Sequence, residues 1–156
     1  MMKLPNLGPI GELEASEWIG TPPAPTLAEL RGRVIAIEAF QMLCPGCVAH
    51  GLPQATRIHQ GFGDELVVLG LHTVFEHHEV MTPAALKVFL SEYRIPFPVA
   101  IDEPRGTGTP ATMTRLGLRG TPSLLLVDKH GDVRLHHFGQ ADDLLLGGVI
   151  GRLLAE

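Results

Sequence analysis

Both cysteines of the chain lie in one short segment, Cys44-Pro45-Gly46-Cys47, with two residues between them. Proline is favoured at the first position of a helix, so Pro45 would place Cys44 at the N-cap and Cys47 one turn further on. The unpaired amides and the positive dipole end of that turn favour a thiolate. Thiolates attack disulfides. The spacing therefore predicts that Cys44 attacks a substrate disulfide and that Cys47 resolves the mixed disulfide.

The same pair could hold a metal ion, because CxxC motifs also occur in zinc sites. His50, three residues after Cys47, would add a third ligand, and His77 and His78 could lie nearby. A structural disulfide explains little, since a loop of four residues removes too little chain entropy to stabilise a fold of this size. We expect the eight histidines to be surface residues, and we predict no metal and no cofactor.

A single acid, Glu38, interrupts an otherwise apolar run six residues before the first cysteine. The run Arg33–Phe40 (RVIAIEAF) is typical of a strand buried on both faces. By alternation, Glu38 shares a face with Ala36 and Phe40. Burying a carboxylate is costly, so an acid here needs a function or an exit to solvent. One interpretation is a general base with a raised pKa that takes the proton from Cys47. The other is an acid at a solvated strand edge.

A proline also precedes the apolar run Ser123–Asp128 (SLLLVD). Pro122 cannot donate a hydrogen bond to a neighbouring strand. A cis Thr121–Pro122 bond would turn the chain tightly and leave the backbone of Thr121 free to pair with an extended substrate.

Taken together, these motifs resemble those of the thioredoxin superfamily. Its members have a buried acid six residues before the first CxxC cysteine and a cis-proline loop of the form G-x-R-G-x-P-T/S-L, which matches Gly117–Leu124 (GLRGTPSL). The resemblance implies that Pro122 is cis, faces the cysteine pair and helps to dock the substrate cysteine. The implied catalytic residues are Cys44, Cys47 and Glu38, and the implied substrate-binding residues are Thr121, Pro122, Leu43, Pro45 and Gly46.

Two further segments resemble the TlpA-like and ResA-like branch of thiol–disulfide oxidoreductases, the redoxins. Thr26–Phe40 (TLAELRGRVIAIEAF) matches the start of that domain, and Thr82–Asp102 matches its additional strand and helix. The similarity covers roughly residues 26–155. It implies an α/β protein with the thioredoxin-like three-layer α/β/α fold, a mixed central sheet and a TlpA-like strand–helix insertion.

The chain departs from the family pattern at three places. Leu43 replaces the aromatic residue that usually precedes the first cysteine, and the central dipeptide is Pro45-Gly46 rather than Gly-Pro. Pro53 lies six residues after Cys47, whereas the family's helix proline usually lies five residues after it. One extra residue predicts a local bulge in that helix.

The elements that must position these residues follow from periodicity and turn residues. Strands that alternate with helices and end in a hairpin predict a mixed sheet covered on both faces. The expected order is a short strand 15–19, a helical turn capped by Thr26 and ending at Gly32, strand 33–40, helix 45–61 kinked at Pro53, strand 66–73, a helix capped by Thr82, strand 96–102, helix 111–116, hairpin 123–138 and helix 141–155.

Residues 1–25 are rich in proline and glycine and are predicted to form an irregular N-terminal arm, followed by one domain at 26–156. In the last predicted helix Gly147, Gly148 and Gly151 each cost about 1 kcal/mol relative to alanine. We expect close packing on the sheet to explain these three glycines.

The composition is that of a globular domain: 156 residues, 45% hydrophobic and 19% charged. A net charge of −5 provides no basic surface for nucleic acid or an anionic membrane, so neither is expected as a partner. The start of the chain lacks the apolar segment of a signal peptide and begins Met-Met, which predicts a cytoplasmic protein. Removal of a leader would instead place it in the periplasm.

The expected function is thiol–disulfide exchange through the Cys44–Cys47 pair, with a disulfide-containing protein or a small thiol as substrate. An external reductant, such as a thioredoxin reductase or glutathione, would recycle the pair. A peroxiredoxin-like peroxidase with Cys44 as the peroxidatic residue is the alternative, although Gln41 and Ile37 stand where that family has a hydroxyl residue and a proline. A zinc-binding module is the third possibility. In the cytosol a reductase is the expected direction, because thiols there are kept reduced.

Overall fold

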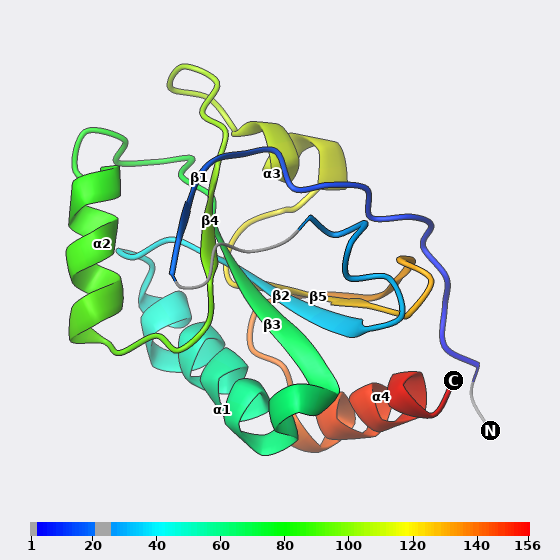
Figure 1. Cartoon of the computed structure of the whole chain (residues 1–156). Coiled ribbons are helices and arrows are strands. Elements are labelled where there is room, and N and C mark those ends of the chain that lie inside the picture. Colours follow the sequence, from blue (N-terminus) through cyan, green and yellow to red (C-terminus); the bar gives the residue numbers. More distant parts are fainter. Residues whose placement is uncertain (1–2, 21–25) are drawn as a thin grey trace.

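The apolar, β-branched runs of the sequence form a mixed six-stranded sheet with helices on both faces (Figure 1). The structure is a computed structural model and describes residues 3–20 and 26–156. The strands are β1 (Ala15–Ile19), β2 (Val34–Phe40), β3 (Leu66–His72), β4 (Val99–Asp102), β5 (Ser123–Val127) and β6 (Val133–Phe138). The helices are α1 (Leu52–Phe62), α2 (Pro83–Glu92), α3 (Ala111–Leu116) and α4 (Asp143–Ala155), with a π-helical turn at Cys47–Gly51 before α1 and a 3-10 turn at Gly63–Glu65 after it.

The central strands place the cysteine segment at one edge of the sheet. The strand order is β1-β4-β3-β2-β5-β6, with β2, β3 and β4 parallel and the others antiparallel to their neighbours. All residues of β2 are buried, as expected for a strand covered on both faces. Phe40 and His72 are partners at the carboxyl ends of β2 and β3. Because parallel strands leave a sheet at the same edge, the chain that follows each of them meets there.

Each face of the sheet carries its own apolar cluster. Ala36 and Phe40 of β2 pack with side chains of α1, α2 and α4. Ile35 and Ile37, on the other face, pack with α3 and with Ile10 of the N-terminal segment. In Figure 1, α1 and α4 lie below the sheet and α3 lies above it. The predicted three-layer fold with a mixed central sheet is confirmed.

Side-chain caps start α2, where the sequence predicts one at Thr82, and α4, where none was predicted. Thr82 Oγ1 accepts a hydrogen bond from the N–H of Ala85 at 3.2 Å, and Asp142 Oδ1 accepts one from the N–H of Leu145 at 2.9 Å. The helix that Thr82 starts is α2, and β4 follows it. Together they form the strand–helix insertion that the resemblance implies.

Thr26 Oγ1 accepts a hydrogen bond from the Glu29 N–H at 3.2 Å, as expected of the predicted cap, but residues 27–32 form consecutive hydrogen-bonded turns rather than an α-helical turn. Several N–H groups here donate to the carbonyl three residues earlier. The Glu12 carboxylate, from the N-terminal segment, accepts hydrogen bonds from the N–H groups of Leu27 and Ala28 at 2.6 and 3.0 Å. These first amides would have no partner within a helix, so Glu12 caps the segment through a contact that is distant in sequence.

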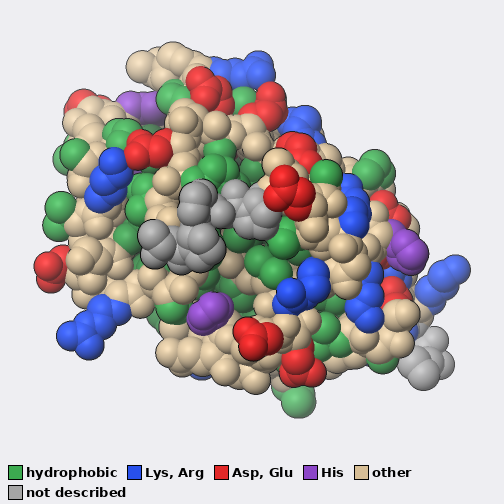
Figure 2. Space-filling model, viewed as in Figure 1, with side chains coloured by type: hydrophobic (Ala, Val, Ile, Leu, Met, Phe, Trp, Pro, Cys, Tyr) green, Lys and Arg blue, Asp and Glu red, His purple; other side chains and the backbone are tan. Residues whose placement is uncertain are grey.

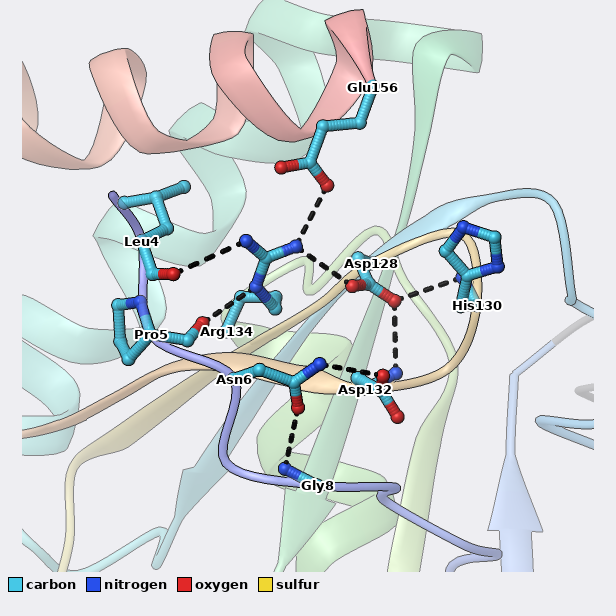
Figure 3. A network of polar contacts seen from close by, with 9 residues as sticks. All are labelled: Leu4, Pro5, Asn6, Gly8, Asp128, His130, Asp132, Arg134 and Glu156. Atoms are coloured by element: carbon cyan, nitrogen blue, oxygen red, sulfur yellow. Dashed lines mark hydrogen bonds and ion pairs between the residues drawn. The ribbon is translucent and has the colours of Figure 1, made fainter. Parts of the chain in front are cut away.

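The N-terminal segment is held on the domain at both of its ends. β1 is the strand predicted at 15–19 and pairs with β4. Near the start, the Arg134 guanidinium donates to the carbonyls of Leu4 and Pro5 at 3.4 and 2.6 Å (Figure 3). The same guanidinium pairs with Asp128 at 3.0 Å and with Glu156 at 2.8 Å.

The proposed boundary between an arm and a domain at residue 25 stays a prediction. Residues 1–2 and 21–25 of the predicted arm, which include Pro22, Pro23 and Pro25, lie outside the described residues.

On the face drawn in Figure 2, acidic and basic side chains lie interspersed rather than gathered by sign. Within residues 3–20 and 26–156, every helix is too short or too polar to cross a membrane.

The expected explanation for the α4 glycines is wrong. A Cβ added at Gly147, Gly148 or Gly151 would have no atom within 4 Å beyond the helix backbone. These glycines therefore face open space, and the sheet does not require them.

Gly148→Ala is expected to raise the free energy of unfolding by about 0.5–1 kcal/mol, because alanine is the better helix former and nothing obstructs its methyl group. The midpoint of urea denaturation measures the change. Gly70→Ala is the matched control and should be destabilising, since its Cβ would lie 2.9 Å from Val99 Cγ2. An unchanged or lower midpoint for Gly148→Ala would contradict the open environment of that position.

Candidate active site

Cys44 lies at the N-cap of a helix, as its sequence neighbours predict. The chain leaves β2 at Phe40, turns through a hydrogen bond from the Cys44 N–H to the Gln41 carbonyl, and becomes helical at Pro45. The Cys47 N–H donates to Cys44 Sγ at 3.3 Å. This is the hydrogen bond that an N-cap side chain normally accepts, so the helix start stabilises negative charge on the Cys44 sulfur.

The two thiols occupy different environments. Cys44 is partly exposed, whereas Cys47 is fully buried in the apolar cluster on the α1 side of the sheet. Burial, followed by the hydrogen bond with Cys44, raises the pKa of the Cys47 thiol well above its ordinary value, and weaker contributions from Gln41 and Thr121 oppose this shift. Cys47 is therefore a neutral thiol in the reduced protein and needs a base before it can act as a nucleophile.

The helix that follows contains the predicted bulge. The Leu52 N–H donates to the Cys47 carbonyl, five residues earlier, and Cys47–Gly51 forms a π-helical turn. The extra residue before Pro53 is accommodated there. Cys47 and Leu52, which begin and follow this turn, are both buried in the same apolar cluster.

Glu38 lies on the central strand β2 with its side chain buried, so the interpretation as an acid at a solvated edge is wrong. Its carboxyl group lies under Gly51, because a Cβ built there would overlap Glu38 Oε1 and lie 3.3 Å from Glu38 Cδ. Among the described residues, Oε1 has no hydrogen-bond partner. Burial raises the pKa of Glu38 well above its ordinary value, and negative charge on Cys44 raises it further.

The loop before β5 closes the other side of the site. The Thr121–Pro122 bond is cis, as the resemblance implies. Cys44 Sγ donates to the Thr121 carbonyl at 3.5 Å. A Cβ on Gly46 would lie 3.4 Å from Pro122 Cδ, so the cysteine loop and the proline face each other.

The structure thus brings the predicted residues together. Cys44, Cys47, Gly46, Thr121 and Pro122 meet at the carboxyl edge of β2, with the Glu38 carboxyl group beneath them. Leu43, with 54% of its surface exposed, and the exposed Pro45 form the outer rim beside Cys44.

Buried polar side chains hold the segment before Cys44 in place. The sequence analysis did not predict them. His72 Nε2 accepts a hydrogen bond from the Met42 N–H at 3.1 Å. The Gln41 amide accepts from the Phe75 N–H at 3.1 Å and donates to Glu76 Oε1 at 3.2 Å. These bonds tie the cysteine loop to the chain that leaves β3.

His72 corrects the expectation that all histidines lie at the surface, since only 2% of it is exposed. Its position at the end of the apolar run 66–73 was the available signal. Burial lowers the pKa of His72 to about 4. The ring is therefore neutral near pH 7, which leaves Nε2 free to accept the Met42 N–H.

The histidines proposed as metal ligands do not gather. His50 and His77 are exposed and His78 is half-buried. Over the described ranges, no three His, Cys, Asp or Glu side chains are placed to hold a metal ion. The alternative with Cys44, Cys47 and His50 as ligands therefore gains no support from the geometry.

Solved structures share this fold and much of the sequence. A protein described as a thioredoxin-like superfamily protein is 57% identical, with 96% of this chain and 97% of that chain covered and a TM-score of 0.93. A thiol-disulfide isomerase from Corynebacterium glutamicum is 50% identical over 96% of this chain and 98% of that chain, with a TM-score of 0.91. Neither a protein-family model nor a curated protein sequence matches the chain.

A more distant structure shares the fold alone. A DsbF homologue from Corynebacterium diphtheriae is 20% identical, covers 93% of this chain and 86% of its own, and has a TM-score of 0.71.

We expect the free energy of unfolding to fall by about 3 kcal/mol as the pH drops from about 6.5 to about 4, on account of His72. The folded-state pKa lies below the unfolded value, so in this window the unfolded chain binds a proton that the folded chain does not. Denaturant unfolding at a series of pH values measures the slope.

His72→Gln is the control, because its amide oxygen can still accept the Met42 N–H but does not titrate. The raised pKa of Glu38 acts in the opposite direction in both proteins, so the difference between them isolates His72. Equal slopes for the two proteins would exclude the buried neutral imidazole.

Proposed function

This chain belongs to the thioredoxin-like superfamily, and we propose that it is a thiol–disulfide oxidoreductase that exchanges disulfides through Cys44 and Cys47. The observation that carries the proposal is the environment of one sulfur atom. Cys44 Sγ accepts the Cys47 N–H at 3.3 Å, faces the Thr121 carbonyl at 3.5 Å, and lies above a buried carboxyl group. The similarity to a thiol-disulfide isomerase at 50% identity supports the same activity class.

In the first step, the Cys44 thiolate attacks one sulfur of a substrate disulfide. A bond forms between Cys44 and that sulfur, the substrate S–S bond breaks, and the other substrate sulfur leaves as a thiolate that takes a proton from water. Only Cys44 is exposed enough to meet a substrate, because Cys47 is fully buried.

In the second step, Cys47 gives its proton to the Glu38 carboxylate and attacks the Cys44 sulfur. The bond between Cys44 and the substrate breaks, the second substrate thiolate leaves, and Cys44 and Cys47 end as a disulfide. The substrate has gained two electrons and the protein has lost two. The raised pKa of the Cys47 thiol explains why this step needs a base.

The charge on Cys44 determines at which stage Glu38 can accept the proton of Cys47. While Cys44 is a thiolate, its charge raises the pKa of Glu38 and helps the carboxyl group to keep a proton. Once that sulfur is bound in a mixed disulfide, the charge is gone and Glu38 releases its proton more readily. Glu38 is therefore more readily ionised, and able to accept a proton, at the stage when Cys47 must be deprotonated.

We assign substrate binding to the residues at the rim of this site. The backbone of Thr121 lies beside Cys44 and can pair with an extended segment of substrate. Pro122, Leu43, Pro45 and Gly46 surround the same sulfur and would contact the residues that flank the substrate cysteine. A protein disulfide or a small thiol compound fits this open, mainly apolar rim.

Recycling requires a reductant of the dithiol or glutathione type when the protein acts as a reductase. The identity of the external reductant stays a prediction. The cytoplasmic location expected from the sequence also stays a prediction.

Nothing in the geometry favours the peroxidase alternative. Gln41, which stands where a peroxidase needs a hydroxyl group, has its amide bonded to Phe75 and Glu76.

Cys44→Ser should abolish reduction of insulin disulfides by dithiothreitol, because the attacking sulfur is lost. Cys47→Ser should keep the first step and accumulate a mixed disulfide with the substrate, visible as a mass shift on non-reducing analysis. Turnover by Cys44→Ser at the unmodified rate would refute the assignment of the nucleophile.

Glu38→Ala is expected to slow mixed-disulfide resolution on the order of 100-fold, the usual contribution of a positioned base, while the first step changes little. Stopped-flow absorbance with a chromogenic aryl disulfide separates the two steps, since each releases one coloured thiolate. A second phase as fast as that of the unmodified protein would remove Glu38 from the mechanism.

A further inference from the structure

One residue of the helix that carries the cysteines touches Glu38 in a way no other residue type could. Gly51 ends the π-helical turn and is buried. A Cβ there would overlap Glu38 Oε1 and would lie 2.7 Å from Pro122 Cβ. Gly61, in α1 of the same helical segment, has nothing within 4 Å of its own Cβ position. The close contact is therefore specific to Gly51.

The π-helical turn keeps Leu52 on the buried face of the helix, beside Gly51 and Cys47. An α-helix turns about 100° at each residue, so one additional residue would rotate everything beyond it away from the sheet. The hydrogen bond from Leu52 back to Cys47 widens one turn and absorbs that residue. As a result, Cys47 and Leu52 both face the same apolar cluster, and Gly51 lies between them over the carboxyl group.

The contact matters because hydrogen bonds do not fix this end of the carboxyl group. Glu38 Oε1 is buried and has no hydrogen-bond partner among the described residues. Its position is set by what surrounds it, which is the bare backbone of Gly51 and the ring of Pro122. A side chain at position 51 would push either the carboxyl group or the helix aside, and each movement separates Glu38 from the two sulfurs.

We propose that Gly51 is a positioning residue for disulfide exchange: the missing side chain lets the helix rest on the Glu38 carboxyl group and holds that group beneath the cysteine pair. The inference rests on the proposed function, and in particular on Glu38 as the base for Cys47. Gly51 itself touches neither substrate nor the reacting sulfurs.

The test uses 5,5′-dithiobis(2-nitrobenzoate), a symmetric aryl disulfide, mixed with the reduced protein in a stopped-flow instrument. Attack by Cys44 releases the first coloured thiolate, and resolution by Cys47 releases the second. Gly51→Ala is expected to slow the second phase about 10- to 100-fold, within the range lost when a base is displaced, and to change the first phase less than about 3-fold. Gly61→Ala, the matched control, should leave both phases unchanged.

A double-mutant cycle separates positioning from a general loss of structure. In a Glu38→Ala protein there is no carboxyl group to displace and only the 2.7 Å approach to Pro122 Cβ remains, so adding Gly51→Ala should slow the second phase much less than it does in the unmodified protein, a strong departure from additivity. If Gly51→Ala slows resolution as much in that background as in the unmodified protein, or slows both phases equally, the positioning role is refuted.

Glu38→Asp provides a second arm that does not depend on the folding of Gly51→Ala alone. The shorter side chain withdraws the carboxyl group and relieves its overlap with a methyl group at position 51, so that only the 2.7 Å approach to Pro122 Cβ remains. Adding Gly51→Ala to Glu38→Asp should therefore leave the second phase within about 3-fold of Glu38→Asp, because the contact is relieved. A further loss of 10-fold or more would overturn the inference.

The outcomes also separate this inference from the proposed function. If the unmodified protein shows no second coloured thiolate, exchange through the pair fails. If Glu38→Ala leaves the second phase unchanged, the role of Glu38 fails, and that of Gly51 with it. If Glu38→Ala slows the second phase but Gly51→Ala does not, only the inference about Gly51 fails.

Discussion

A carboxyl group enclosed between the central strand and the helix that carries the cysteines is the constraint on which the site depends. Glu38 pairs with Gly70 of β3 and Leu124 of β5, neither of which has a polar side chain, and its Oε1 has no partner among the described residues. Such burial is unfavourable for a charge, so the group holds its proton more tightly than in water. The fold accepts that cost at the place where the proposed mechanism requires a base for the buried Cys47 thiol.

The rest of the fold keeps the reacting groups in place around that carboxyl group. Parallel β2 and β3 end at one edge, and the buried His72 and Gln41 connect the two segments that leave it. This connection fixes the start of the helix, and the helix start in turn directs the Cys47 N–H at the Cys44 sulfur. The two thiols are left in different environments, Cys44 partly exposed and Cys47 buried, and burial raises the pKa of the Cys47 thiol.

The positions at which the sequence departs from the family pattern alter the structure only in their immediate surroundings. The additional residue before Pro53 is absorbed in one π-helical turn, which leaves the buried face of α1 in contact with the sheet. Gly51, at the end of this turn, lies against Glu38. An aliphatic Leu43 in place of an aromatic residue changes only the exposed rim.

The sequence alone determined the order of the elements and Cys44 at a helix N-cap, because these depend on periodicity and caps that are local in the chain. The bulge before Pro53 and the set of residues around the cysteines followed from the resemblance to the thioredoxin superfamily. Tertiary structure decided the burial of His72, the turns at 26–32 under Glu12, the open surroundings of the α4 glycines and the contact between Gly51 and Glu38. Each of these depends on what lies across from the residue in space. Spacing along a chain specifies which way a side chain points, but only the packed fold specifies what it meets there.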